Sequence, residues 1–369
     1  MRGLYVHIPF CVRKCAYCDF YSIPGHLDLL DKYIASLLQE AHKYSGLTCK
    51  TIYLGGGTPS LLTPTHLRHL LAGLNHEFSL SAVNEATIEA NPDSMNNELL
   101  CTALECGINR ISFGVQSLSN SELQSVGRLH NAAQAIKNIK AAKSAGFQNI
   151  SADLMIGLPG QTWLTLKHSL ERLLTLEVQH LSVYCLSLEA GTPLSENVPA
   201  NLPNDDMQVD LFDRTRKLLQ ANGFIHYEIS NFSRPGFKCQ HNVNYWRGGE
   251  YLGLGPAAAS HLEGIRFKNK PDLDAYLKRP TVQTTEVEQL NLKEKAEEET
   301  ILRLRLLTEG VNITNLKKKY GQLPTQLIAD RLEQMTTNAE LIRQKTVYRL
   351  NPAYTMTSNR IFTRFLTAD

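Results

Sequence analysis

The stretch "LYVHIPFCVRKCAYCDF", residues 4–20, joins a short apolar run to three closely spaced cysteines. The run "LYVHI" at 4–8 is rich in residues that favour strands, so it predicts a first β-strand that ends just before the cysteines. Five similar runs follow at 51–55, 86–90, 110–115, 150–157 and 180–188. The opening stretch is therefore the first unit of a repeated pattern.

Segments with helical spacing lie between these runs, at 28–44, 63–74, 96–107, 132–146 and 162–176. Gly107 and Gly146 stand where helix C-terminal caps belong. Six strand–helix units by about residue 222 predict an α/β fold, a parallel sheet curled into a full or partial barrel. In such barrels the chemistry collects where strands end and loops begin.

The pattern changes after about residue 230. Residues 231–264 are rich in glycine and aromatics without a clear period, which predicts a structured loop region closing one end of the barrel. Further on, helical patterns followed by a hairpin pattern predict a small winged-helix-like α+β appendage, in which "KEKAEEE" is a solvated helix face. We expect a barrel domain at 1–230, a closing region at 231–285 and the appendage at 286–369.

Composition narrows the class of protein. The net charge of +2 on 369 residues argues against a broad nucleic-acid footprint, and the basic "LKKKYG" is too isolated to change this. No apolar run is long enough for a transmembrane segment, and we expect a cytoplasmic protein, either monomer or dimer. Five cysteines outside the first stretch lack a disulfide-scaffold pattern and are expected to be reduced: Cys49, Cys101, Cys106, Cys185 and Cys239.

The cluster of Cys11, Cys15 and Cys18 has two readings. On a helix, spacings of four and three would place all three thiols on one buried face. Against this, the segment directly follows a strand and contains Pro9, and neighbouring cationic side chains favour thiolates. Structural zinc sites usually have four protein ligands, and iron–sulfur clusters usually have four cysteines. Three cysteines leave one metal position open, which indicates reactivity or ligand binding at the metal rather than a purely structural role.

The CxxxCxxC spacing after a first barrel strand, with Tyr17 before the last cysteine, resembles the radical S-adenosylmethionine superfamily. The resemblance implies a 4Fe-4S cluster held by Cys11, Cys15 and Cys18. It further implies that the amino and carboxylate groups of S-adenosylmethionine chelate the fourth iron. An electron from a donor such as a flavodoxin-type protein then cleaves the sulfonium to a 5′-deoxyadenosyl radical.

"LGGGTPS" at 54–60 follows the second predicted strand. Three glycines allow backbone amides to approach a charged ligand, whereas a tight strand-to-helix turn explains one glycine more easily than three. In the resembled superfamily this stretch meets the methionyl amino group. That role carries over to Gly55, Gly56, Gly57 and Thr58.

Polar residues follow several predicted strands. Taken singly, a strand-end carboxylate such as Glu89 or Asp153 is as often a helix cap, and an arginine such as Arg128 is usually a surface charge. Together they match positions near S-adenosylmethionine in the branch that contains oxygen-independent coproporphyrinogen III oxidase, as do two further residues, Tyr5 and Gln116.

Chemistry suggests a role for several of these groups. Glu89 and Asp153 accept hydrogen bonds from ribose hydroxyls or the ammonium group, Arg128 pairs with the methionyl carboxylate, and Tyr17 lies against adenine. These assignments are hypotheses about the bound state.

Two features separate the functions within this branch. Oxidases of the branch carry a further cysteine two positions after the third, where this chain has Phe20 after Asp19. The sequence matches instead a sister group of haem chaperones, whose start reads HIPFC...C.YCDF. Oxidase activity in porphyrin biosynthesis is therefore not expected.

The second feature is "HNVNYW" at 241–246, which resembles a motif tied to haem handling. Neutral imidazole is a common axial ligand of iron, which makes His241 a candidate. The alternative is a loop whose aromatics seal the barrel end, with His241 hydrogen-bonded in place. The other haem-binding candidates are Asn242, Tyr245, Trp246 and Cys239.

Three hypotheses follow. The first is a haem chaperone that passes haem to acceptor haem proteins and retains the cluster and the S-adenosylmethionine site. The second is a radical enzyme, an oxygen-independent coproporphyrinogen III oxidase. The third is nucleic-acid binding by the appendage, which the near-neutral charge disfavours.

Overall fold

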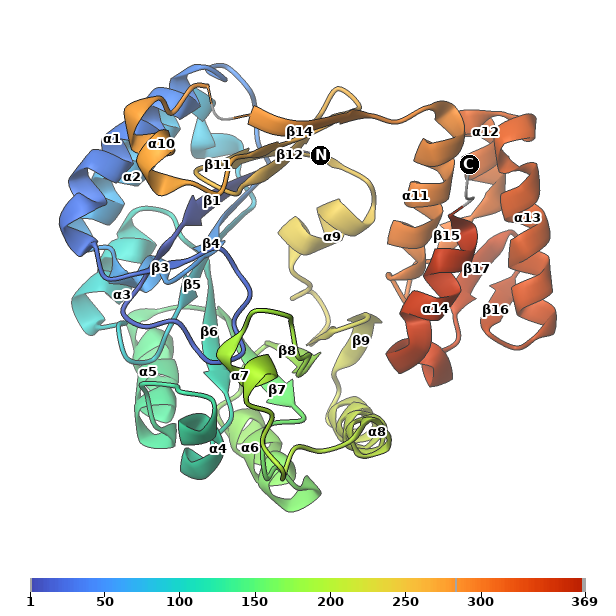
Figure 1. Cartoon of the computed structure of the whole chain (residues 1–369), viewed down its shortest axis with the longest axis horizontal. Helices are drawn as coiled ribbons and strands as arrows, with labels where there is room; N and C mark the ends of the chain where they lie inside the picture. The colour runs from blue at the N-terminus through green and yellow to red at the C-terminus, as the bar shows by residue number, and fades with distance from the viewer. Residues whose placement is uncertain (1, 283, 367–369) are drawn as a thin grey trace.

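The computed structural model describes residues 2–282 and 284–366. Its main sheet contains the six predicted strands as consecutive parallel neighbours, each buried on both faces by side chains of the core (Figure 1). The strands are β1 Arg2–Ile8, β4 Thr51–Gly56, β5 Glu85–Ala90, β6 Arg110–Gln116, β7 Asn149–Ile156 and β8 His180–Cys185. The predicted partial barrel is confirmed.

Helices cross over between these strands and cover the outside of the sheet (Figure 1). Local signals define their ends: Asn131 and Gln134 form a capping box at the start of α5, and Gly146 ends it at φ 119°. The helices are α1 Leu30–His42, α2 Pro64–Phe78, α3 Asn97–Glu105, α4 Asn120–Ser125, α5 Ala132–Ala145, α6 Trp163–Thr175, α7 Pro193–Glu196 and α8 Asp205–Ala221. Short 3-10 turns lie at Leu27–Leu29, Pro59–Leu61 and Leu80–Ala82.

The predicted loop region at 231–264 is wrong, because this segment extends the sheet at both edges. Within the described residues the sheet has twelve strands in the order β14-β13-β12-β11-β1-β4-β5-β6-β7-β8-β10-β9. The added elements are β9 Ile225–Glu228, β10 Asn231–Ser233, α9 Gln240–Trp246, β11 Glu250–Leu254, β12 Ala259–Leu262, β13 Ile265–Asn269, α10 Leu273–Lys278 and β14 Thr284–Gln289. These strands are too short, and too interrupted by glycine, for a period of two to be visible in the sequence.

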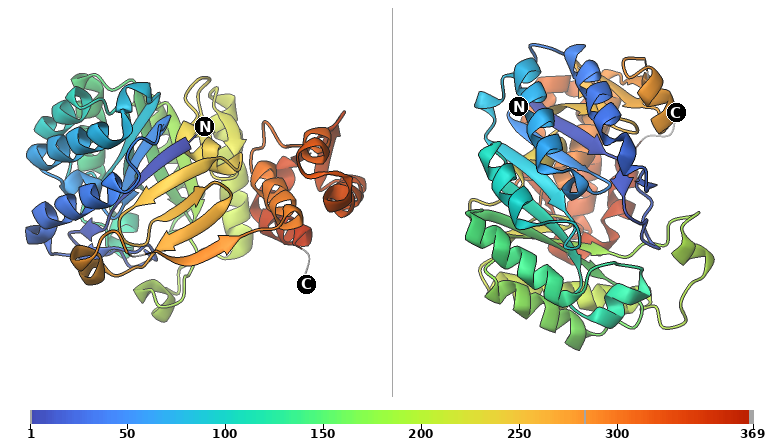
Figure 2. Two further views of the ribbon diagram at one scale, coloured as in Figure 1. Left: turned by 90° about the horizontal axis from the view of Figure 1, so that it is seen from above. Right: turned by 90° about the vertical axis from the view of Figure 1, so that its left-hand side faces the viewer.

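β11 pairs with β1 in parallel, and β12, β13 and β14 follow as antiparallel strands (Figure 2). The sheet therefore continues past β1 into a ribbon that leads to the C-terminal part of the chain. Helix α9 packs against the ribbon strand β11 and lies near the amino-terminal ends of β1, β4 and β5.

The C-terminal part is a small α+β unit with its own hydrophobic core, as expected for the appendage. Its elements are α11 Leu292–Leu304, β15 Val311–Asn312, α12 Ile313–Tyr320, α13 Gln322–Thr337, β16 Leu341–Gln344, β17 Val347–Leu350 and α14 Ser358–Phe362, with 3-10 turns at Pro352–Thr357 and Thr363–Phe365. Its helices lie beyond α9 from the main sheet (Figure 1). No helix in the described part of the chain is long and apolar enough to span a bilayer.

The segment "KEKAEEE" in α11 is not the uniformly solvated face that we expected. Glu297 and Glu299 are buried. Glu299 accepts hydrogen bonds from Arg303 Nε at 2.7 Å and from Lys319 Nζ at 2.6 Å. The acidic run therefore supplies a buried anion that connects α11 to α12.

Candidate functional site

The three clustered cysteines lie in an irregular loop at the carboxyl end of β1. Cys11 ends the two-residue strand β2 Phe10–Cys11, which pairs with β3 Ile23–Pro24, and no helix contains Cys15 or Cys18. The helical-stripe reading of the three thiols is therefore wrong. Proline in the "HIPFC" segment and the strand pairing of Cys11 hold the chain extended where a helix would need to begin.

Backbone hydrogen bonds fix this cysteine loop to distant segments. Ala16 N donates to Val126 O at 3.2 Å, and Leu194 N donates to Ala16 O at 2.9 Å. The Arg13 guanidinium donates to Gly127 O at 2.6 Å. The cysteine loop is therefore fixed by hydrogen bonds to backbone groups both of residues 126–127 and of Leu194.

A cavity of about 390 Å³ opens beside this loop, at the carboxyl ends of the strands. This volume lies in the range of pockets that bind small organic ligands. All predicted cluster and S-adenosylmethionine residues line it, except Tyr5 and Gly55. Those lining it are Cys11, Cys15, Cys18, Tyr17, Gly56, Gly57, Thr58, Glu89, Gln116, Arg128 and Asp153.

The glycine-rich stretch does not present its amides to this cavity as we predicted. Gly57 N donates to Ile8 O and Thr58 N donates to Phe10 O, both at 2.8 Å, while Gly56 N donates to Glu89 Oε2 at 3.2 Å. A Cβ on Gly57 would lie 2.7 Å from Phe10 O, so close packing of two chain segments requires glycine there. Because the amides are occupied, this stretch offers carbonyl oxygens, which accept hydrogen bonds from an ammonium group.

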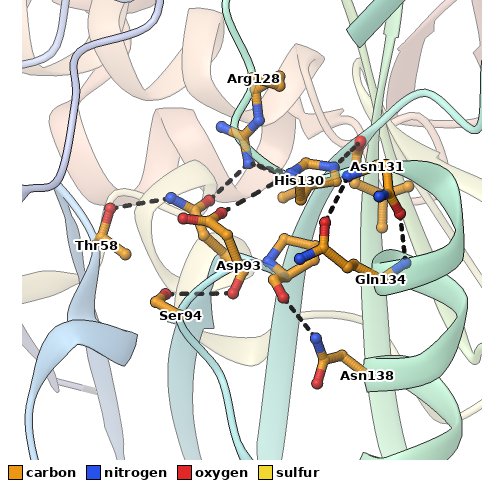
Figure 3. A network of polar contacts seen from close by, with 12 residues as sticks. Thr58, Asp93, Ser94, Arg128, His130, Asn131, Gln134 and Asn138 are labelled. Carbon is orange, nitrogen blue, oxygen red and sulfur yellow. Dashed lines mark hydrogen bonds and ion pairs between the residues drawn. The ribbon is translucent and has the colours of Figure 1, made fainter. Parts of the chain in front are cut away.

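A chain of hydrogen bonds joins two of the cysteines across the cavity wall. Figure 3 labels two of its members, Thr58 and Arg128. Cys11 Sγ lies 3.4 Å from Thr58 Oγ1, which accepts from Asn91 Nδ2 at 3.0 Å. Arg128 Nη2 donates to Asn91 Oδ1 at 2.8 Å, and Arg128 Nη1 lies 3.5 Å from Cys15 Sγ. Asn91 therefore sits at the centre of a relay from one thiol to the other.

His130 supports the Arg128 guanidinium from behind (Figure 3). Its Nε2 donates to Val115 O at 3.0 Å, which leaves Nδ1 to accept from Arg128 Nη2 at 3.4 Å. Burial lowers the pKa of His130 to about 4, and the adjacent Arg128 lowers it further. His130 is therefore neutral near pH 7, as its acceptor role requires.

Two partly buried carboxyl groups, those of Glu89 and Asp153, line the cavity. Burial raises the pKa of Glu89 to about 7, and Asp153 acts in the same direction, while hydrogen bonds from Tyr53 and Gly56 oppose the shift. Burial also raises the pKa of Asp153, which accepts from Ser112 Oγ at 3.2 Å. A cationic ligand would favour the ionised form of both carboxyl groups, so they suit an ammonium. As hydrogen-bond acceptors they also suit the hydroxyl groups of a ribose.

Tyr5 and Gly55, which we assigned to the same ligand, lie outside this cavity. The Tyr5 hydroxyl lies 2.9 Å from His7 Nδ1, and its ring stacks on Tyr53 at 6.3 Å. A Cβ on Gly55 would meet Tyr53 at 2.9 Å and Glu89 at 3.0 Å, so that glycine lets Glu89 approach the strand. The strand register places both positions on the same face of the sheet as Glu89, so it is not strand alternation that keeps them out of the cavity lining.

The residues present fit a three-cysteine cluster and a chelating ligand. In the part of the chain that the structure describes, no three His, Cys, Asp or Glu side chains gather around a single metal ion. A 4Fe-4S cluster asks for something different, since each cysteine binds a separate iron. Three thiols that line the cavity, with the Arg128 guanidinium beside them, are groups that the cluster and an amino acid would use.

The candidate haem residues lie elsewhere, near the amino-terminal ends of the strands. His241 is 1% exposed, its Nδ1 lies 2.9 Å from Thr51 Oγ1, and its Nε2 lies 2.7 Å from the Tyr245 hydroxyl. Burial lowers the pKa of His241 to about 3, with Arg110 acting in the same direction. Both ring nitrogens are thus occupied, the arrangement described by our alternative interpretation of this motif.

The other predicted haem residues differ from His241 and from one another in their burial and contacts. Cys239 is fully buried with Sγ 3.6 Å from Glu85 Oε1, and burial raises its pKa to about 12. Tyr245 and Trp246 line a second cavity, whereas Asn242 does not. The structure therefore divides the predicted haem residues between the protein core and a cavity wall.

Sequence reasoning missed several side chains that line the cluster cavity, above all Asn91. It stands two positions after Glu89, directly beyond the end of β5, where a polar residue in a βα loop is a signal for the site. Ser112 was detectable as well, since it alternates on β6 with other cavity residues. Tyr184 had no such signal.

Comparisons with known proteins agree with this geometry. Residues 5–173 match the radical SAM superfamily. The chain is 37% identical to the heme chaperone HemW of Lactococcus lactis over 378 residues, covering 100% of this chain and 98% of that protein. It is 34% identical to HemW of Bacillus subtilis, with 99% of each chain covered.

A solved structure shares the fold along almost the whole chain. Coproporphyrinogen III oxidase (HemN) of Escherichia coli superposes with a TM-score of 0.86 at 22% identity, covering 99% of this chain and 89% of that one. At this identity the likeness concerns the fold alone, whereas the two HemW proteins match over their full lengths at higher identity. The chain belongs to the HemW family, within the radical S-adenosylmethionine superfamily.

Proposed function

We propose that this protein is a haem chaperone that binds haem and passes it to acceptor haem proteins, while holding a 4Fe-4S cluster and S-adenosylmethionine in its first cavity. Two observations together support the proposal. The chain is similar along its whole length to the heme chaperone HemW, and Phe20 lies at the cavity mouth. Phe20 is 66% exposed and occupies the place of the oxidase cysteine.

Within the first cavity, Cys11, Cys15 and Cys18 are proposed to bind three irons of the cluster. The cluster, when bound, supplies an electron to the sulfonium of S-adenosylmethionine. The neighbouring Arg128, 3.5 Å from Cys15 Sγ, is placed to pair with a carboxylate beside the open iron.

The remaining contacts follow from the cavity wall. Glu89, Asp153 and Gln116 offer acceptors to ribose hydroxyls or an ammonium, and the carbonyl oxygens of Gly56 and Gly57 accept from the amino group. Tyr17 contributes a ring beside Met155 and Leu186, suited to a planar base.

The competing function is oxygen-independent coproporphyrinogen III oxidation, and one assay separates the two. Protein reconstituted anaerobically with iron and sulfide is given coproporphyrinogen III, S-adenosylmethionine and dithionite, and in parallel is titrated with haem and then mixed with an apo-haem protein. The proposal expects haem bound at one per chain and transferred, without decarboxylation. Decarboxylated porphyrinogen in the first reaction would overturn it.

A pair of cysteine variants tests which thiols bind the cluster. Cys15→Ser removes a proposed ligand, whereas Cys101→Ser removes an exposed thiol outside the cavity. We expect the first variant to lose the iron–sulfur absorption and the second to retain it. Equal cluster content in both would remove Cys15 from the ligand set.

The electron donor is proposed to be a flavodoxin-type protein that docks at the cavity mouth. Arg13 and Lys14 are exposed beside the cysteine loop and favour an acidic partner. Substituting Lys14→Glu should slow cluster reduction by flavodoxin and leave reduction by dithionite unchanged. Equal rates with flavodoxin would exclude this rim as the docking surface.

A further inference from the structure

The Glu89 carboxylate lines the cluster cavity and is held by a side chain that does not. The Tyr53 hydroxyl, on β4, donates to Glu89 Oε1 at 2.7 Å, and the Gly56 amide donates to Oε2 at 3.2 Å. Within the described residues, Tyr53 lines neither the cluster cavity nor the second cavity, which Tyr245 and Trp246 line and which we call the aromatic cavity. Each oxygen of the carboxylate thus has one internal donor and keeps the capacity to accept a further hydrogen bond from a ligand.

The glycine-rich stretch leaves room for this contact. Tyr53 and Gly55 are two positions apart on β4, and the register of β4 with β5 places both on the same face of the sheet as Glu89. A Cβ on Gly55 would lie 2.9 Å from the Tyr53 ring and 3.0 Å from the Glu89 carboxyl group. A larger residue at position 55 would therefore displace one of the two side chains.

Two other rings fix the orientation of the Tyr53 ring. It stacks on His241 at 5.1 Å with 27° between the ring planes, and on Tyr5 at 6.3 Å with 29° between them. His241 comes from α9 (Figure 1), and both of its ring nitrogens lie within hydrogen-bond distance of hydroxyl groups. The Tyr53 ring therefore has little freedom to turn, and its hydroxyl stays directed at Glu89.

The protonation states suit this donor and this acceptor. Burial raises the pKa of Tyr53 well above its ordinary value, and the charge of Glu89 adds to the rise, so the hydroxyl keeps its proton. Burial raises the pKa of Glu89 to about 7. The hydrogen bond from Tyr53 is the largest of the effects that oppose this rise, because it favours the ionised form of the carboxyl group.

Other charged or titratable groups also face the Glu89 carboxyl group. They are Asp153 on β7, Arg110 on β6, Tyr5 on β1 and Tyr184 on β8. Asp153 raises the pKa of Glu89, whereas Arg110 lowers it. Among the side chains that the structure describes, Tyr53 alone donates a hydrogen bond to this carboxylate.

We infer that Tyr53 is a positioning residue of the cluster cavity, which fixes the Glu89 carboxylate as an acceptor for the ammonium group or the ribose hydroxyls of S-adenosylmethionine. The inference rests on the proposed binding of that cofactor and adds a residue from outside the cavity. Gly55 provides the space for the contact, and the His241 ring supports it from α9. Tyr53 acts on the ligand only through Glu89.

Tyr53→Phe removes the hydroxyl and keeps the ring, so the stacking contacts remain. In the cluster-free protein, infrared titration of the carboxyl bands should show Glu89 ionising at a higher pH than in wild type, because the hydrogen bond to its ionised form is lost. Glu89→Gln identifies the band, since it removes that carboxyl group. An unchanged titration of Glu89 in Tyr53→Phe would overturn the inference.

Calorimetric titration of reconstituted protein with S-adenosylmethionine tests the consequence for binding. Tyr53→Phe should bind roughly tenfold more weakly than wild type at about pH 6, and the difference should shrink above about pH 8 as Glu89 ionises in both proteins. Tyr320→Phe is the matched control and should bind as wild type does, because its hydroxyl donates to Glu299 Oε2 at 2.8 Å in the C-terminal unit. A loss that is equal at every pH would give Tyr53 a merely structural role and overturn the inference.

Gly55→Ala disturbs the same contact by a different route. Its Cβ should displace Tyr53 or Glu89 and weaken binding of S-adenosylmethionine, while the cluster absorption remains. Combined with Tyr53→Phe, the two losses should be less than additive, because both act through Glu89. Fully additive losses would overturn the inference and leave the cofactor proposal standing, whereas failure of wild-type protein to bind S-adenosylmethionine would overturn the cofactor proposal and this role of Tyr53 together.

Discussion

Asn91 connects groups from three separate loops: it follows β5 itself, Thr58 follows β4, and Arg128 follows α4. Its amide donates to Thr58 Oγ1 and accepts from Arg128, and each of these neighbours contacts a cysteine of the cluster loop. A single side chain thus sets the distance between the thiols of Cys11 and Cys15. Replacing it removes one hydrogen-bond partner from each of Thr58 and Arg128 in a partly buried wall.

Asn91→Ala should therefore weaken S-adenosylmethionine binding by roughly tenfold and change the electron paramagnetic resonance spectrum of the reduced cluster, because Arg128 and Thr58 lose their shared partner. Calorimetric titration and spectroscopy of reconstituted protein measure the two effects. Asn138→Ala is the matched control, since that amide donates to Pro92 O away from the cavity. Unchanged affinity and spectrum for Asn91→Ala would show that the relay is not needed.

Glu89 gives the stability of the cluster-free protein a pH dependence. Its pKa is about 7 in the fold against 4.5 for the free side chain, so between these values the folded state binds more protons than the unfolded state. The free energy of unfolding therefore falls as pH rises from about 4.5 to 7, by at most roughly 3 kcal/mol from this group. Above pH 7 the loss is complete.

Glu89→Gln keeps the acceptor oxygen but removes the ionisation. Relative to wild type, this variant should gain stability as pH rises from 5 to 8 in urea unfolding. Glu171→Gln, on the exposed face of α6, reports the effect of losing a surface carboxylate. A constant difference between Glu89→Gln and wild type across this pH range would contradict the burial argument.

At the scale of elements, α9 depends on contacts outside itself. It has seven residues, too few for a helix that is stable alone. The Glu85 carboxylate at the start of β5 accepts from Gln240 N at 3.0 Å and His241 N at 2.9 Å. Glu85 also faces the buried Arg110 and raises its pKa, although burial itself acts in the opposite direction.

Glu85→Ala should destabilise the protein by about 1–3 kcal/mol, because it leaves the backbone amides of Gln240 and His241 without their carboxylate acceptor. Hydrogen exchange should accelerate most at the amides of α9, and Glu85→Gln should show a smaller effect since its amide oxygen still accepts. The exposed Glu98→Ala in the first turn of α3 serves as control. Unaltered exchange in α9 would mean that its other contacts suffice.

At the scale of the whole molecule, the fold keeps two cavities apart. The cluster cavity lies at the carboxyl ends of the strands, whereas the aromatic cavity lies between α9, the ribbon and the C-terminal unit. β1 is the element that both share, because Tyr5 lines the second cavity and the cysteine loop follows the same strand.

We therefore expect the two sites to be lost separately. Cluster-free Cys15→Ser should keep the haem absorption band, and Trp246→Leu, which changes a lining residue of the second cavity, should keep the iron–sulfur band, with affinities within about threefold of wild type as sites that share no contacts usually behave. Parallel titrations of both variants measure this. Loss of both ligands from one correctly folded variant would show that the sites form a single cooperative unit.

The sequence was sufficient to predict the six parallel strands and the cysteine loop. Periodic apolar runs from 4–8 to 180–188 predicted the six parallel strands, because strands buried on both faces need continuous apolar character. The spacing of Cys11, Cys15 and Cys18 after the first strand identified the cluster loop, since ligands close in sequence need no tertiary contact to be recognised.

Other features depend on contacts between residues far apart in the chain. The pairing of β11 with β1, 248 residues away in sequence at Arg2 and Glu250, is invisible to local patterns. The same holds for the amides of Gly56, Gly57 and Thr58, which the fold uses internally. The sequence by itself determined which residues are candidates for binding the metal cluster and haem. Only the tertiary structure decided that both ring nitrogens of His241 are occupied, by Thr51 and Tyr245, because a side chain's availability depends on the neighbours that folding brings to it.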